Sequence, residues 1–167
     1  MDRILDADTA LLVSQIKTML KDLRSRGVDE DMIGAITRKD DGAGRVVLDR
    51  GYLILPDEGK ARIRLTPMER TLYIFLAEKK DGVVAADLWK HFDDLCRIYR
   101  TQTVYDDLDL ISDAVDALCE DDKKTFRTNI SRIRKKIADK AGKWASERYG
   151  IRRDGDGRYR VDVDLVR

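Results

Sequence analysis

The hydrophobic pattern of the chain changes its period at Thr66. Before this residue, Ala61, Ile63 and Leu65 alternate with arginines, which is the two-residue period of a strand with one buried face. After it, Thr66-Pro67-Met68-Glu69 combines a capping threonine, a proline in the first helical position and the glutamate of a capping box. A strand that leads directly into a well-marked helix predicts an α+β domain.

Further patterns extend this strand and helix on both sides. Short strands are expected at residues 46–48 and 52–55, and they join the strand at 61–65 in a small antiparallel sheet. The segment after the sheet is expected to contain helices over 66–81, 85–99, 106–119 and 124–141, a short strand at 83–84, and a β-hairpin over 149–163.

The first part of the chain is a separate helical segment. Within residues 8–26 an apolar stripe recurs at helical spacing, formed by Leu12, Ile16, Met19 and Leu23. A second short helix follows, and residues 39–44 resemble a flexible linker. Because an isolated helix of this length is marginal in water, the stripe must pack on the sheet or on its twin in a homodimer, which we favour. The expected domains are residues 1–44 and 45–167.

Charge is strongly segregated along the chain, although the formal net charge is only +1. Residues 93–121 contain nine acids and two bases, whereas residues 123–153 contain twelve bases and two acids. An acidic block is therefore followed directly by a basic block, and this local balance matters more for binding than the total.

The basic block has the phase of an amphipathic helix. If Phe126, Ile130, Ile133 and Ile137 face the core, the opposite face carries cations and short hydroxyls at Lys124, Thr125, Thr128, Ser131, Arg132 and Lys135. This mixture suits phosphates and the base edges of the DNA major groove. A merely solvated helix face is the alternative. The hairpin that follows carries Arg152, Arg153, Arg158 and Arg160, and its position favours docking on DNA.

Four segments in one order resemble a known family over residues 45–164. They are Ile63-Arg64-Leu65-Thr66-Pro67-Met68-Glu69, then Asp81-Gly82-Val83-Val84 with Leu88-Trp89, then Thr125-Phe126-Arg127-Thr128-Asn129-Ile130-Ser131-Arg132-Ile133-Arg134-Lys135-Lys136-Ile137, and finally Gly155-Asp156-Gly157-Arg158-Tyr159-Arg160-Val161. In this order they resemble the DNA-binding effector domain of OmpR/PhoB-type response regulators. The resemblance implies a winged helix-turn-helix fold with an N-terminal antiparallel sheet and a C-terminal β-hairpin wing.

The resemblance also implies a function and a set of DNA-binding residues. The chain is expected to be a sequence-specific double-stranded DNA-binding transcription regulator, with its recognition helix 124–141 in the major groove. Thr128 and Arg132 would reach bases, and Asn129 and Ser131 would add polar contacts. The wing 149–163 would approach the minor groove. Lys124, Thr125 and Arg134 would lie near phosphates, and a wing arginine, Arg152 or Arg153, near the minor groove. The remaining expected DNA-binding residues are Arg127, Lys135 and Arg158.

The chain departs from this family at two places. Residues 1–44 are too few for a phosphoacceptor receiver domain, so control by phosphorylation is not expected. An acidic insertion at about 93–122, partly helical, stands where the family has a short loop. It is expected to contact RNA polymerase or a regulator, to mask the basic helix, or simply to pack with a solvated acidic face. A winged helix that binds protein through this insertion, with little or no DNA affinity, is the alternative function.

Other chemistry finds little support in the sequence. One histidine and two cysteines are too few for a His/Cys zinc site, and no convergent polar set suggests catalysis, so neither an enzyme nor a cofactor is expected. Gly42-Ala43-Gly44 lacks the lysine of a phosphate loop. No apolar run approaches membrane-spanning length, so we expect a cytoplasmic protein with reduced thiols and no membrane partner.

Overall fold

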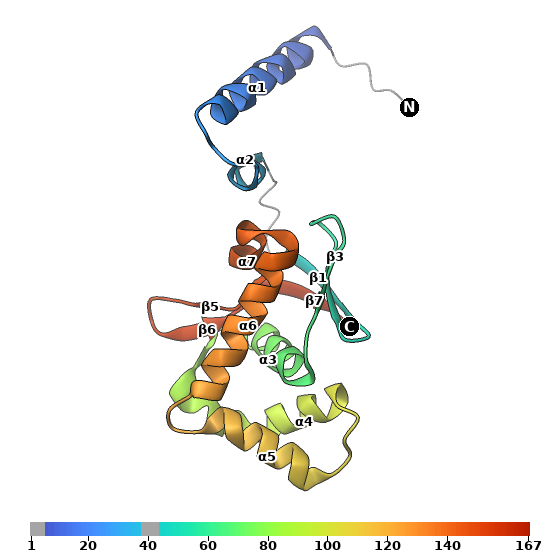
Figure 1. Cartoon of the computed structure of the whole chain (residues 1–167), viewed down its shortest axis with the longest axis vertical. Helices are drawn as coiled ribbons and strands as arrows, with labels where there is room; N and C mark the ends of the chain where they lie inside the picture. Colours follow the sequence, from blue (N-terminus) through green and yellow to red (C-terminus); the bar gives the residue numbers. More distant parts are fainter. Residues whose placement is uncertain (1–5, 38–43) are drawn as a thin grey trace. The chain divides into compact units, whose positions relative to one another are not determined.

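The computed structural model describes residues 6–37 and 44–167 of the chain (Figure 1). The chain divides into two compact units, residues 1–40 and 41–167, which are described separately below. Most of the expected linker lies outside the described residues, but Gly44 begins a strand.

The smaller unit consists of α1 (Ala7–Ser25) and α2 (Glu30–Thr37). The Asp6 side chain caps α1 by accepting a 2.8 Å hydrogen bond from the Thr9 amide. Arg24 near the end of α1 pairs with Glu30 at the start of α2 over 2.6 Å. No residue of α1 is buried, so the apolar stripe expected from the sequence is exposed along most of its length.

The larger unit is an α+β fold with a four-stranded sheet in the order β3-β2-β1-β7. Antiparallel pairing joins β1 to β2 and β2 to β3, whereas β7 runs parallel to β1. The antiparallel pairing expected for the first three strands is confirmed, but the sheet as a whole is mixed. Val163, which the sequence pattern assigns to the hairpin, begins a fourth strand that pairs with β1 on the side away from β2. The strands are β1 (Gly44–Asp49), β2 (Tyr52–Leu55), β3 (Ala61–Arg64) and β7 (Val163–Val166).

The central helix of this unit is α3 (Pro67–Glu78), which begins with the expected capping box. The Glu69 amide donates to Thr66 Oγ1 over 3.3 Å, and the Thr66 amide donates to Glu69 Oε2 over 2.8 Å. Nearly every residue from Glu69 to Ala77 is buried, because the sheet packs on one side of α3 and other helices on the other. Figure 1 shows α6 (Lys124–Ala141) crossing in front of α3.

The segment expected to form one helix over 85–99 contains two elements instead. A 3₁₀ helix, η1 (Ala85–His91), is followed by α4 (Phe92–Gln102). The first part of the acidic segment 93–122, residues 93–102, lies in α4, which packs on α3. The rest of the acidic segment contains α5 (Leu108–Cys119), whose Ile111, Val115 and Leu118 are buried.

A second sheet of three short strands has the order β4-β6-β5. Its strands are β4 (Val83–Val84), β5 (Arg152–Arg153) and β6 (Arg158–Arg160). The expected hairpin over 149–163 is thus shorter, and its first strand does not begin at Tyr149. That residue ends α7 (Lys143–Tyr149), a helix that no pattern in the sequence predicted.

Within the described ranges, no helix has both the length and the hydropathy needed to cross a membrane.

Candidate nucleic-acid interface

Helix α6 has one buried face and one basic face, as its sequence predicts. Phe126, Ile130, Ile133 and Ile137 are buried against α3, α5 and β3. The opposite face is open to solvent, with six of the expected site residues exposed and two half-buried. The exposed ones are Lys124, Arg127, Ser131, Arg132, Arg134 and Lys135, and the half-buried ones are Thr125 and Thr128.

Asn129 is placed differently from the other expected site residues. It lies on the buried side of α6 with 8% of its surface exposed, and its Nδ2 donates to the Thr125 carbonyl over 2.9 Å. At about 100° per residue, position 129 falls beside the apolar stripe rather than opposite it. The Asn129 side chain is therefore bonded back to its own helix and is not presented to a ligand.

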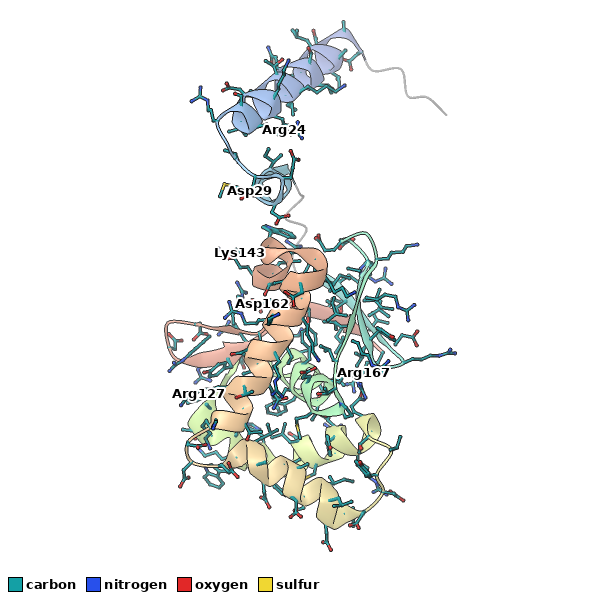
Figure 2. The ribbon with its side chains drawn as sticks, in the orientation of Figure 1. Arg24, Asp29, Arg127, Lys143, Asp162 and Arg167 are labelled. Carbon is teal, nitrogen blue, oxygen red and sulfur yellow. The ribbon has the colours of Figure 1, made fainter. Side chains whose placement is uncertain are left out.

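Most cations on the exposed face of α6 are not neutralised by an ion pair with a described residue, so they can attract an external anion. Lys135 pairs with Asp139 over 2.7 Å, an exposed pair of small energetic value. Lys124, Arg127, Arg132 and Arg134 form no ion pair with any residue that the structure describes. Arg127 lies near the α5 end of α6, and Lys143 follows the opposite end (Figure 2). Positive charge thus extends along the whole helix.

A short arginine-rich hairpin lies beside this helix. Arg152 is opposite Arg160, and Arg153 is opposite Tyr159. Asp154 closes the turn, since its Oδ1 accepts hydrogen bonds from the amides of Asp156 at 3.1 Å and Arg158 at 3.0 Å. The turn is therefore fixed by its own residues.

The charge state of Asp154 follows from these contacts. Partial burial raises the pKa of its carboxyl, but the amide hydrogen bonds and the Arg160 guanidinium 2.9 Å away lower that pKa below its ordinary value of 3.8. Asp154 therefore remains ionised at neutral pH and holds Arg160 against the hairpin.

The four hairpin arginines are not equivalent. Arg152 pairs with Asp162 over 2.7 Å, and Arg160 pairs with Asp154. Arg153 lies over the Tyr159 ring, 5.7 Å from its centroid, and Arg158 is exposed. Arg153 and Arg158 make no ion pair with a described residue and are the hairpin cations best placed for an external anion.

An aromatic contact fixes the hairpin relative to α6. The rings of Phe126 and Tyr159 meet edge to face, with centroids 4.9 Å apart and planes at 85°. Phe126 belongs to the first turn of α6, and Tyr159 is the middle residue of β6 and pairs with Val83 of β4. Because both rings are buried, the helix and the hairpin are held as one surface.

Helix α7 supports α6 from one flank. Ser146 Oγ donates to the Arg134 carbonyl over 2.8 Å. Gly150 approaches so closely that a Cβ there would lie 2.3 Å from the Ser146 carbonyl oxygen and 3.3 Å from Arg134 Cγ. The other flank of α6 is fastened to α3, where Lys136 Nζ lies 2.6 Å from the buried Glu69 carboxylate.

The acidic helix α5 packs on α6 without covering its basic face. The two helices are in contact, and Lys123 just before α6 donates through Nζ to the Cys119 carbonyl over 2.8 Å. Between the described side chains of α5 and α6 no ion pair is formed. The acids of this region gather into no group that could hold a metal ion, as far as the described residues extend.

Several residues that shape this surface were not predicted from the sequence. Tyr159, Lys136 and Ser146 position α6 and the hairpin through partners that lie far away along the chain. The buried Tyr73 hydroxyl likewise donates to the Tyr149 carbonyl over 2.7 Å and anchors α7 to α3. No local motif marks these pairs, so only the fold reveals them.

In comparisons with known proteins, no family model matches the chain, and neither curated proteins nor solved structures give a match.

Proposed function

We propose that the chain is a sequence-specific double-stranded DNA-binding transcription regulator of the winged-helix type, without catalytic activity. The observation that carries this proposal is the exposed cationic face of α6, joined to an arginine-bearing hairpin through the Phe126–Tyr159 contact. A rigid helix and an adjacent hairpin match the way winged helix-turn-helix proteins dock, with the helix in the major groove.

The order of the elements supports this assignment. In this proposal α3, α4 and α6 would be the three core helices, and the small sheet of β4, β5 and β6 would carry the wing. In this proposal Thr128 and Arg132 contact bases, and Lys124, Thr125, Arg127 and Arg134 contact phosphates. Arg153 and Arg158 replace Arg152 as the leading minor-groove residues, because Arg152 is engaged by Asp162.

A protein partner is proposed for the acidic helix and the loop before it. Asp109, Asp113 and Asp116 are exposed on α5. Large apolar side chains beside them are also exposed, namely Val104, Tyr105, Leu108 and Leu110. Apolar contacts rimmed by acids suit a basic protein surface, such as RNA polymerase or another regulator. This observation also favours the alternative function, a winged helix that binds protein only.

Selection of duplexes from random DNA at moderate salt tests the proposal. The intact chain is expected to enrich one motif. Replacing α5 is unsuitable as a comparison because Val115 and Leu118 belong to the core. The matched variant is Asp109→Asn with Asp113→Asn and Asp116→Asn, which removes charge without removing packing. Enrichment by the variant alone would indicate electrostatic masking by α5. No enrichment by either protein, with both folded, would reject DNA binding and favour the protein-binding function.

A further inference from the structure

Two open depressions adjoin on the larger unit, away from the β5–β6 hairpin. One has a volume of about 470 Å³ and is lined by Arg50, Arg64, Arg70 and Arg167. The other, of about 530 Å³, shares Arg64 and Arg70 with it and adds Lys136. In Figure 2, Arg167 lies to the right of α3, whereas the hairpin lies to its left. These depressions are therefore separate from the hairpin that the DNA proposal uses.

The charge of this two-part site is not balanced from within. No aspartate or glutamate side chain is among the described residues that line either depression. Lys136 is compensated by Glu69, and Arg167 by Glu78. Arg50, Arg64 and Arg70 form no ion pair with a described residue, so three positive charges remain around one concave surface.

Arg70 occupies the centre of the site and is held firmly by neutral acceptors. It donates to the Leu65 carbonyl at 2.6 Å and to the carbonyl and side-chain oxygens of Gln102 at 2.7 and 3.0 Å. Desolvation and the nearby Arg64 lower the pKa of Arg70 from its ordinary value, and Glu69 offsets this only in part. A fixed, partly desolvated guanidinium that faces another cation gains from a bound anion.

The β1–β2 turn lies close to this guanidinium. Gly51 has φ +86°, and a Cβ there would lie 3.1 Å from Arg70 Nη1. Arg50 has φ +46°, in the left-handed region that asparagine, aspartate and glycine tolerate better. The turn thus places Arg50 in the lining of the same depression as Arg64 and Arg70.

We infer that these adjoining depressions bind a small molecule that carries two or more linked phosphates, either a nucleoside polyphosphate or free polyphosphate. Guanidinium groups recognise phosphate oxygens through paired hydrogen bonds, and several around one depression select a polyanion over a single charge. The volumes are in the range of small-molecule sites. Leu48, Leu65 and Pro67 add an apolar lining for the remainder of a nucleotide. This inference does not depend on the proposed DNA binding.

Calorimetric titration of the full chain with ATP, ADP, AMP and inorganic triphosphate tests the site directly. Saturable binding of ATP or triphosphate, at least about tenfold tighter than binding of AMP, is expected. Equal affinity for ATP and triphosphate would mean that the site recognises the phosphates alone. Tighter binding of ATP than of triphosphate would mean that the site also contacts the nucleoside. Each lost charge-assisted contact should weaken binding about tenfold or more, as in Arg50→Asn and Arg64→Gln.

A matched control distinguishes a specific binding site from non-specific attraction of anions to the positively charged surface. Arg62→Gln removes a neighbouring exposed arginine of β3 that does not line either depression, and it should leave the affinity within about twofold. Asparagine suits the left-handed backbone of this turn, so the melting temperature of the Arg50→Asn variant should not fall. An unchanged melting temperature would exclude misfolding as the cause of weaker binding. Absence of saturable binding, or equal losses from all three variants, would overturn the inference. It would also be overturned if Arg50→Asn and Arg64→Gln weakened duplex DNA binding while no polyphosphate bound.

Discussion

Arg132 and Lys124 lie on the same helix, and the proposed function gives them different roles: Arg132 contacts bases and Lys124 contacts phosphates. Both are exposed and unpaired among the described residues, and about eight residues of helix separate them, or roughly 12 Å along the axis. Arg132→Ala is expected to cost about 1–3 kcal/mol of DNA-binding free energy and to relax sequence preference. Lys124→Ala should weaken binding to all duplexes alike, because a phosphate contact carries no base information. Competition assays with matched and scrambled duplexes measure the affinity and the sequence preference of each variant. Equal losses of affinity for all duplexes in both variants would contradict the different roles of the two residues.

Phe126 and Tyr159 together determine whether helix and hairpin act as one surface. Phe126→Ala is expected to reduce the free energy of unfolding by about 3–5 kcal/mol, since a fully buried ring is removed. A double-mutant cycle with Tyr159→Ala should yield a coupling of about 0.5–1.5 kcal/mol for the edge-to-face pair. Denaturant unfolding of the four proteins gives the coupling. A value near zero would mean that the contact does not hold the two elements together.

At the scale of elements, the sequence predicted the helices that have clear periodicity and caps, and the strands that have turn signals, but missed the short helix α7 and the strand that depends on distant pairing. The Thr66–Glu69 capping box marks α3 reliably, and the apolar stripe of α6 identifies its buried residues. Helix α7 was missed because seven residues contain too few turns to show a period. The strand that begins at Val163 was not predicted, because Val163 pairs with Gly44, which lies far away along the chain.

Gly150 tests the importance of the unanticipated helix α7. Gly150→Ala would place a methyl group 2.3 Å from the Ser146 carbonyl oxygen, so the C-terminal end of α7 must distort, and the methyl group would also lie 3.3 Å from Arg134 Cγ of α6. We expect a loss of stability of about 1–3 kcal/mol and weaker DNA binding through the displaced Arg134. Thermal unfolding and duplex binding check both effects. Gly155→Ala is the matched control, because nothing lies within 4 Å of a Cβ at that position; equal effects of the two changes would contradict the steric argument.

At the scale of the whole molecule, the sequence indicated the basic surface but not the arginine-lined depressions. The site residues of α6 are neighbours along the chain, so their helical phase is visible in the sequence alone. Arg64 and Arg70 are six residues apart, but Arg50 and Arg167 come from distant parts of the chain. Only the packing of β1, β3, β7 and α3 brings the four together. Long-range assembly of this kind leaves no periodic signal.

The smaller unit is proposed to join two copies of the chain. Leu12, Ile16 and Met19 are 58%, 49% and 59% exposed along one side of α1, which is unusual for an apolar stripe. Ile16→Glu is expected to convert a dimer into a monomer in sedimentation experiments, with the unfolding of the larger unit unchanged. Ser14→Glu, an exposed position on the same helix outside the stripe, is the control. A chain that is monomeric before substitution would contradict homodimer formation.

The most direct test of DNA recognition by α6 is the salt dependence of duplex affinity for the selected motif. The association constant is measured by fluorescence anisotropy between 50 and 200 mM salt. The slope of its logarithm against the logarithm of the salt concentration should be about −4 or steeper, as expected for roughly five phosphate contacts. Lys124→Ala combined with Arg127→Ala and Arg134→Ala should make that slope shallower by about three, one for each lost contact. A slope near zero, or one that these changes leave untouched, would contradict the assignment of α6 as the DNA-binding helix.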